Sequence, residues 1–163
     1  MNTEQYIQDE VERQKSVLFD EFRDALNFAK AHPNWNAKSS IEAFVMVLAE
    51  KIEPEVNRFV YETRTSNLRR SEVGFLHGGK ATKAGEVQHQ FDRWYSNLWV
   101  EGILRGGSIQ SRISGDESLC DLYIKQLLQI HPWVDGNGRV ASILRNWMLN
   151  TLDDPSPLPY YSF

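Results

Sequence analysis

The stretch that decides the fold is Ile130-His131-Pro132-Trp133-Val134-Asp135-Gly136-Asn137-Gly138-Arg139. Apolar residues recur at helical spacing on both sides of it, which predicts one helix ending at His131 and another beginning near Gly138. Pro132 ends the first helix because proline has no backbone N–H to continue the helical hydrogen bonds. Trp133 is expected to anchor the connection in the core. The stretch is therefore a short polar turn between two helices.

Each residue type in this turn suits phosphate chemistry at its place. The run Gly136-Asn137-Gly138 tolerates the left-handed backbone angles that turn successive amides toward one point. The following helix adds its N-terminal amides and dipole, which favour an anion, and Arg139 is placed to contact a phosphate oxygen. Asp135 can hold a magnesium ion that bridges phosphates. His131, with an ordinary pKa near 6.5, suits accepting a proton from an attacking hydroxyl.

The segment HPWVDGNGR, residues 131–139, resembles the motif of the Fic family, His-Pro-Phe-x-Asp/Glu-Gly-Asn-Gly-Arg-x-x-Arg, with Trp133 where phenylalanine is usual. The resemblance implies an all-α Fic-type helical bundle. It also implies protein adenylyltransferase activity, which moves AMP from ATP to a Ser, Thr or Tyr hydroxyl of a target protein. By this resemblance His131 is the base and Asp135 positions Mg²⁺, while the phosphates are bound by Gly136, Asn137, Gly138 and Arg139.

Residues 73–84 interrupt the helical pattern with three glycines and two lysines, which predicts a hairpin or an exposed loop. Fic proteins place a β-hairpin flap over the site, where it pairs with an extended segment of the target. Phe75 to Lys83 falls at the corresponding place in this chain. The resemblance therefore assigns flap and target docking to Gly78, Gly79, Lys80, Ala81, Thr82 and Lys83.

The chain departs from the family at Ser142, which stands where the motif has its second arginine. In the family that arginine helps to hold the terminal phosphate of ATP. Arg145, one turn further along, is interpreted as a surface or core-edge cation rather than a replacement. The inhibitory motif of many Fic proteins is not found either, so a separate, antitoxin-like inhibitory protein is one open route of control. Two alternatives also stay open: another donor (phosphate, UMP or phosphocholine), or a catalytically silent binding module.

Apolar spacing predicts further helices over 5–30, from Ser39 or Ser40 onward, over 54–70 and over 85–104. In the helix over 54–70, Val56, Phe59 and Val60 are expected to face inward. Strand-like alternation is nearly absent. We expect a single Fic-like domain over 1–163, with N-terminal helices in 3–51, a core over about 54–152 and an extended tail over 153–163.

Composition sets limits on partners. The 163 residues are 41% hydrophobic and 25% charged, with a net charge of -4, which gives no global attraction to nucleic acid or to an anionic membrane. Arg64, Arg69 and Arg70 are interpreted as a solvated helix face rather than a nucleic-acid patch. Cys120 is the only cysteine and is expected to be buried. The polar, acidic N-terminus predicts a cytoplasmic protein, or one delivered into a host cytosol.

Overall fold

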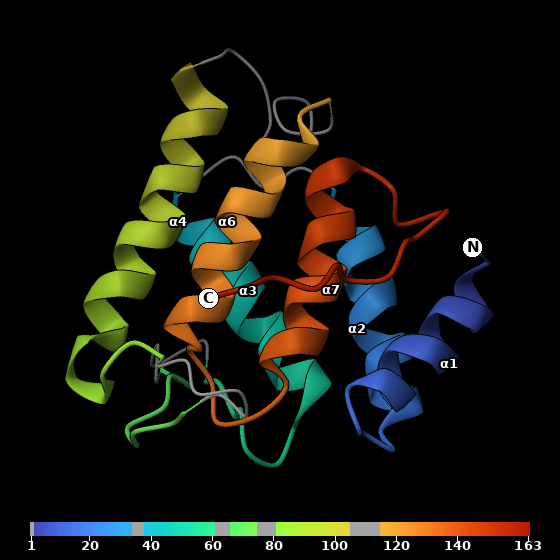
Figure 1. Cartoon of the computed structure of the whole chain (residues 1–163), viewed down its shortest axis with the longest axis horizontal. Helices are drawn as coiled ribbons and strands as arrows, with labels where there is room; N and C mark the ends of the chain where they lie inside the picture. Colours follow the sequence, from blue (N-terminus) through green and yellow to red (C-terminus); the bar gives the residue numbers. More distant parts are fainter. Residues whose placement is uncertain (1, 34–37, 61–65, 75–80, 105–114) are drawn as a thin grey trace.

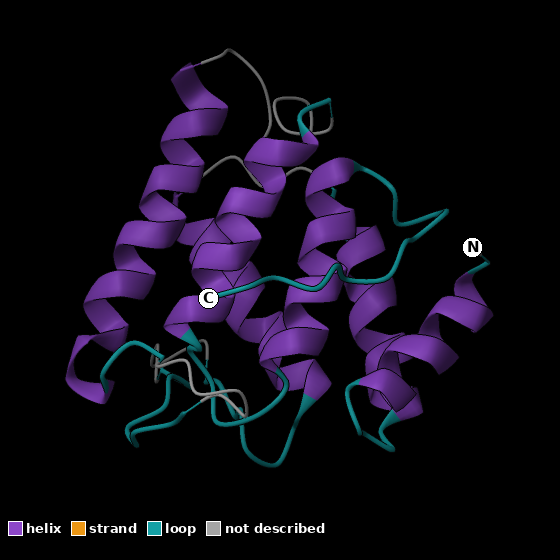
Figure 2. Cartoon of the chain, in the orientation of Figure 1, coloured by secondary structure: helices purple, strands orange, loops and turns teal. Residues whose placement is uncertain are grey.

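The computed structural model describes residues 2–33, 38–60, 66–74, 81–104 and 115–163, and these ranges contain six α-helices and no strand (Figures 1 and 2). Val60 and Gly74 form isolated β-bridges only. The all-α prediction is confirmed for this part of the chain. The predicted β-hairpin is not, because residues 75–80 lie outside the described ranges. None of the described helices is long and apolar enough to cross a membrane.

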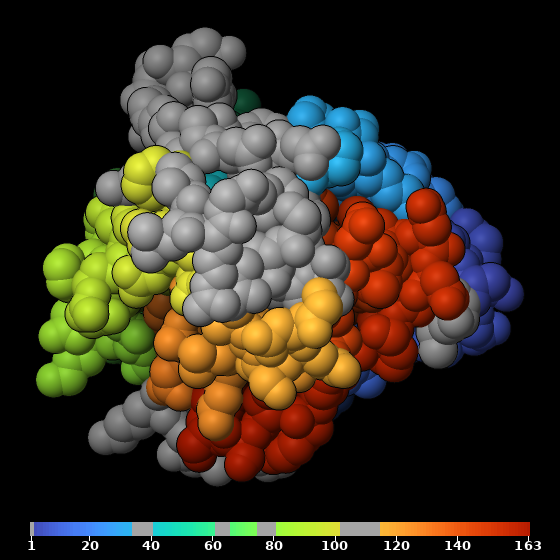
Figure 3. Space-filling model, turned by 90° about the horizontal axis from the view of Figure 1, so that it is seen from above, coloured from blue at the N-terminus to red at the C-terminus, as the bar shows by residue number. Residues whose placement is uncertain are grey.

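The helices are α1 (Thr3–Arg13), α2 (Phe19–Ala31), α3 (Lys38–Ile52), α4 (Val87–Leu104), α6 (Glu117–Ile130) and α7 (Asn137–Leu149), with a 3-10 turn, η1 (Ala84–Glu86), before α4. Helix α7 packs against α1, α2, α3 and α6, while α4 packs against α3 and α6. In Figure 1, α7 therefore lies inside the bundle, with α1 and α4 at opposite flanks, and Figure 3 shows the same separation from above.

The central helix is fixed mainly by its aromatic contacts. Trp147 of α7 is 2% exposed, and its ring lies 4.7 Å from that of Phe44 on α3. Its indole N–H donates to the carbonyl of His32, just past α2, at 2.9 Å. Removing a ring of this size from a core costs about 3–5 kcal/mol. These contacts hold α7 against α2 and α3, and so they fix where its N-terminus lies.

The predicted helix over 5–30 is two helices. Helix α1 ends in a Schellman-type turn, in which Lys15 adopts the left-handed region (φ 57°) and Ser16 N donates to Val11 O at 3.0 Å. The spacing of seven positions from Val11 to Leu18 corresponds to two helical turns, so the apolar pattern does not reveal the break. The turn directs residues 14–18 toward the N-terminus of α7.

The predicted helix over 54–70 is wrong for its described residues, 54–60 and 66–70, which are turns and irregular chain. Phe59 is buried as expected, but Val56 and Val60 are 46% and 38% exposed. Side-chain amides stabilise the irregular path: Asn57 Nδ2 donates to Ala49 O at 3.1 Å, and Asn67 Nδ2 donates to Met46 O at 2.9 Å. These bonds attach the irregular chain to the carbonyl oxygens of α3, so no helix is needed to hold it there.

The tail over 153–163 has no regular secondary structure, as predicted, and it crosses the outer side of α7 and α6 (Figure 1). Leu158 is buried, and its N–H meets Glu10 Oε2 at 3.4 Å. Tyr161 donates its hydroxyl to Asp121 at 2.6 Å. The tail therefore joins α1 to α6 across the body of the molecule.

Candidate active site

The predicted site residues meet at one end of the bundle, the lower end in Figure 1, where α6 ends and α7 begins. His131 is the C-cap of α6 and Gly136 is the N-cap of α7. The first hydrogen bond of α7 runs from Val140 N to Gly136 O at 2.9 Å. The amides of residues 137–139 therefore have no carbonyl partner within the helix, which is the arrangement that favours an anion.

His131 has a left-handed backbone, with φ 51° and ψ 63°. This conformation costs a residue with a Cβ roughly 1–2 kcal/mol, and strain of this kind is concentrated at functional sites. Burial lowers the pKa of the half-buried imidazole below 6.5, and the positive charge of Arg69 lowers it further. A backbone hydrogen bond with Leu128 and the charge of Asp135 act in the opposite direction. The imidazole is thus neutral at pH 7 and able to accept a proton.

The side chain of Asn137 stabilises the loop by two hydrogen bonds to the backbone of Trp133. Its Oδ1 accepts from Trp133 N at 3.1 Å, and its Nδ2 donates to Trp133 O at 2.8 Å. The Trp133 ring is fully buried, as predicted, and its indole N–H donates to Asn67 Oδ1 at 2.9 Å. Asn137 is 4% exposed and its side-chain oxygen and nitrogen are both bonded to Trp133, which favours a phosphate contact through its backbone N–H instead.

The two glycines of the loop serve different purposes. Gly136 is left-handed (φ 83°), and a Cβ built on it would lie 2.7 Å from Ile52 Cγ2. Gly138 is helical, and a Cβ on it would lie 2.3 Å from Gln14 Oε1. The connection between α1 and α2 therefore packs directly over the start of α7. The amide of Gln14 occupies the approach to Gly138.

Arg139 is buried and is engaged by groups from three segments. Its Nη2 lies 2.7 Å from Glu53 Oε1 and 3.4 Å from Asp135 Oδ1, and its Nη1 donates to Ser16 Oγ at 3.1 Å. The Arg139 and Glu53 side chains are only 4% and 15% exposed, so water screens this pair weakly. In this state the positive charge expected to meet phosphate is balanced by carboxylates of the protein itself.

Asp135 could hold a metal ion only together with other ligands. Its side chain is 64% exposed, and its Oδ1 accepts from Gly136 N at 2.7 Å. Within the described residues no cluster of three or more His, Cys, Asp or Glu side chains could enclose a metal. Mg²⁺ usually takes one or two carboxylates together with phosphate oxygens and water. One exposed carboxylate beside a helix N-terminus fits that requirement.

Ser142 is inaccessible to a phosphate. It is 0% exposed, and its hydroxyl lies 2.6 Å from that of Tyr6 on α1, which is buried as well. Arg145 does not reach this position, because its guanidinium lies 2.9 Å from Asp121 and 2.6 Å from Glu117 on α6. Helix α1 thus covers the place of the second motif arginine, and Arg145 does not take its place.

The predicted flap is described only at its end. Gly78, Gly79 and Lys80 lie outside the described residues, whereas residues 81–83 (Ala81, Thr82 and Lys83), here called the flap flank, form an irregular connection to η1. Thr82 N donates to Gln129 O on α6 at 3.1 Å. The flap flank therefore lies against α6 two residues before the predicted base.

Arg69 is the residue that the sequence interpretation missed. It was expected on a solvated face, but it is 3% exposed and donates to backbone carbonyls on both sides of the site. The acceptors are the carbonyl oxygens of Ile130 at 3.0 Å, His131 at 2.5 Å, Ser71 at 2.7 Å and Thr82. Nothing in the pair Arg69-Arg70 distinguishes the buried arginine from the exposed one, since burial depends on the irregular path before it.

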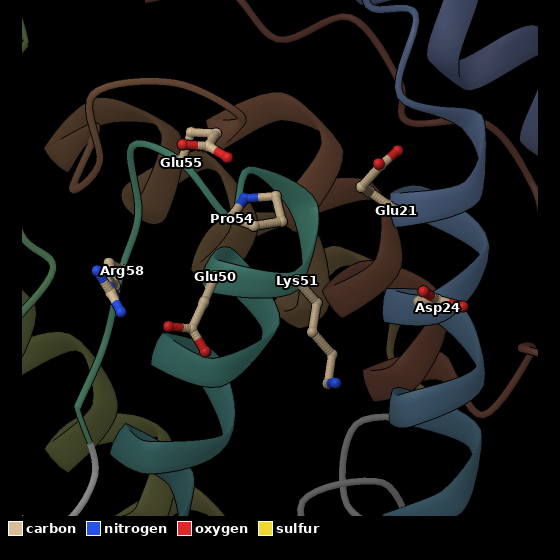
Figure 4. A pocket seen from close by; sticks show the side chains of 7 residues that line it. All are labelled: Glu21, Asp24, Glu50, Lys51, Pro54, Glu55 and Arg58. Carbon is tan, nitrogen blue, oxygen red and sulfur yellow. The ribbon is translucent and has the colours of Figure 1, made fainter.

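A separate hollow of about 570 Å³ lies beside the end of α3, facing α2 (Figure 4). It is lined by Glu21, Asp24, Glu50, Lys51, Pro54, Glu55 and Arg58. None of the predicted site residues lines it. Its charged residues come from α2, from the end of α3 and from the chain that follows α3, and Glu50 is already used to accept from Phe59 N at 2.8 Å. We do not assign it to the candidate site.

Comparison with known proteins agrees with the motif. Residues 108–149 match the model of the Fic/DOC family, so the resemblance is confirmed over this part of the chain. The matched range includes α6, the loop and α7. Members of that family are generally transferases. No curated protein and no solved structure matches the chain.

Proposed function

We propose that this chain is a Fic-fold protein adenylyltransferase, which moves AMP from ATP to a Ser, Thr or Tyr hydroxyl of a target protein. The observation that carries the proposal is the position of His131. A half-buried neutral imidazole in a strained left-handed conformation ends α6, and the anion-favouring N-terminus of α7 follows five residues later in the family's motif. A base and a phosphate site on one loop are what hydroxyl attack on a phosphate requires.

In the proposed reaction the imidazole of His131 accepts the proton of the acceptor hydroxyl. The acceptor oxygen forms a bond to the α-phosphorus of ATP, and the bond between that phosphorus and the bridging oxygen to the β-phosphate breaks, so pyrophosphate leaves. The amides of residues 137–139 and the guanidinium of Arg139 bind phosphate oxygens. Asp135 would hold Mg²⁺, which neutralises phosphate charge when it is bound.

The proposal requires a change at Arg139, whose guanidinium is now balanced by Glu53 and Asp135 and bonded to Ser16. ATP must compete with Glu53 for this cation. Magnesium at Asp135 would remove one of the two competing carboxylates. Binding of donor and metal should therefore be mutually dependent, which a titration of each in the presence of the other would measure.

The experiment that tests the proposal is incubation of the purified chain with Mg²⁺ and α-labelled ATP, with and without cell lysate, beside His131→Ala. Label on protein that disappears with the variant supports transfer of AMP. Equal labelling by both proteins would overturn the role of His131. Parallel reactions with γ-labelled ATP distinguish AMP transfer from phosphate transfer.

The burial of Ser142 under Tyr6 favours a second candidate, a Fic-fold transferase whose donor does not need a cation at that position. UTP and a phosphocholine donor are the alternatives to test in the same assay. The unaltered run Gly136-Asn137-Gly138 favours AMP. Labelling from another donor, absent with ATP and lost in His131→Ala, would replace AMP transfer by this second function. Donor binding without any transfer would indicate a silent binding module.

A further inference from the structure

The contacts of Arg69 go beyond what the loop itself needs. One guanidinium joins four carbonyl oxygens, which belong to Ser71 before the flap, Thr82 in the flap flank, and Ile130 and His131 at the end of α6. The backbone N–H of Arg69 also donates to Pro132 O at 2.7 Å. The chain before the flap, the flap flank and the backbone of the proposed base therefore meet at one side chain.

This arrangement differs from that of the other buried arginines in the described part of the chain. Arg139 and Arg145 each lie against carboxylates, whereas the hydrogen bonds that Arg69 makes within the described residues go to carbonyls, and the carboxylate of Glu72 acts on it through its charge. Taking a guanidinium out of water is costly, and burial lowers the pKa of Arg69. The cost is offset because the carbonyls at the C-terminus of α6 carry the negative end of the helix dipole. The planar guanidinium of arginine has five N–H donors, so it can bond several of these carbonyl oxygens at once.

We propose that Arg69 is a positioning residue that locks the flap flank to the backbone of His131, so that docking of the acceptor and orientation of the base are coupled. This inference rests on the proposed function of His131. Arg69 Nη2 donates to both Thr82 O and Ile130 O, while its Nε donates to His131 O. A displacement of the flap flank would therefore shift the guanidinium, and with it the carbonyl that fixes the left-handed turn at His131.

The lock has a second connection that works in parallel. Thr82 N donates to Gln129 O, so the flap flank is attached to α6 directly as well as through Arg69. Loss of Arg69 leaves the hydrogen bond from Thr82 N to Gln129 O to hold the flap flank near the base. The N–H of Thr82 should then open more often, which makes its hydrogen exchange a direct reporter of the lock.

The variants that test the lock are Arg69→Gln, which removes the charge and the fork, and Arg69→Lys, which keeps only the charge. Arg70→Gln is the matched control, since Arg70 is the exposed neighbour. In Arg69→Gln we expect Thr82 N–H to exchange at least tenfold faster and the pKa of His131 to rise. In Arg69→Lys the exchange should accelerate while the pKa of His131 stays near that of the unaltered protein. Arg70→Gln should change neither.

These readouts need no transfer activity, so they separate this inference from the proposed function. Unchanged Thr82 exchange and unchanged His131 titration in folded Arg69→Gln would overturn the lock even if the chain transfers AMP. If the changes occur as expected but no donor is ever transferred, the lock stands and the proposed function fails. In an active enzyme, both Arg69 variants should lower kcat and raise the KM for the acceptor, with little change in donor affinity.

A measurement on the unaltered protein covers the case in which the Arg69 variants do not fold. The Nε–H of Arg69 should give a slowly exchanging NMR signal because it is buried against His131 O. The chemical shifts of Arg69 Nε–H and of Thr82 N–H should both change as His131 titrates. A Nε–H that exchanges at the rate of a solvated arginine, or that ignores this titration, would overturn the lock.

Discussion

The carboxylate of Glu53 lies 2.7 Å from the guanidinium of Arg139, and both side chains are largely buried. Glu53 directly follows α3, while Arg139 is in the first turn of α7. The ion pair thus ties two helix ends together over the loop proposed to bind phosphate. It also means that a donor nucleotide meets a cation that already has an anionic partner.

Replacing Glu53 by Gln should strengthen donor binding. The charge that competes with phosphate disappears, while a hydrogen-bond acceptor of the same shape remains for Arg139. We expect about tenfold tighter ATP binding in the presence of Mg²⁺, which corresponds to about 1.4 kcal/mol. Isothermal titration calorimetry would measure it, with Glu55→Gln as the control for loss of one exposed negative charge nearby. Equal affinity in the two variants would contradict a competing role for Glu53.

The two glycines of the loop should respond differently to alanine. Gly136→Ala places a Cβ in a left-handed residue against Ile52, which should cost about 1–3 kcal/mol of unfolding free energy. Gly138→Ala meets only the flexible end of Gln14 in a helical position, so its stability should change by less than about 1 kcal/mol. Its added methyl should nevertheless weaken donor binding. Urea denaturation and a binding titration of both variants check this, and equal stability losses would contradict it.

The left-handed backbone of His131 can be tested without any activity. His131→Ala and His131→Gly both lose the imidazole, but only glycine adopts φ 51° without a Cβ penalty. The glycine variant should be more stable than the alanine variant by about 0.5–1 kcal/mol, after allowing for the greater flexibility of glycine in the unfolded chain. Urea denaturation measures the difference. An alanine variant of equal or greater stability would show that His131 is not strained in solution.

The lowered pKa of His131 predicts how transfer depends on pH. Burial and the charge of Arg69 keep the imidazole neutral in the folded protein until the pH falls below 6.5. The acidic limb of kcat/KM should therefore lie below pH 6.5. The same shift makes the unfolded state bind the proton first, so this contribution to stability is present above pH 6.5 and is lost as the pH falls toward the folded-state pKa. An acidic limb above 6.5 would contradict the burial of the imidazole in the active enzyme.

Sequence patterns predicted the helices that have strong apolar periodicity and clear ends. Asp116 begins α6 by accepting from Leu119 N at 3.0 Å, and the turn from Pro132 to Gly136 separates α6 from α7 as expected. The break after Val11 was missed because its two-turn spacing imitates a continuous helix. The path around Asn57 and Asn67 was missed because it depends on side-chain bonds to carbonyls of α3, which no local propensity reveals.

For the site, sequence predicted the loop but not the residues that surround it. His131, Asp135 and Arg139 come together because they lie within one short turn between two helices. Glu53 and Arg69 reach the loop from distant parts of the chain. Arg69 lies 62 positions before His131, and Glu53 lies 86 positions before Arg139. No spacing rule connects them to the motif. Their roles follow from the ion pair and the carbonyl contacts, which only the three-dimensional arrangement shows.

The central claim is that His131 acts as the base in nucleotide transfer to a protein hydroxyl. The most direct measurement compares incorporation of α-labelled ATP into protein by the unaltered chain and by His131→Ala, with ATP binding to both measured in parallel. We predict labelling by the unaltered chain, loss of at least a hundredfold in the variant, and similar ATP affinity. Labelling that survives in the variant at the original rate would contradict the claim.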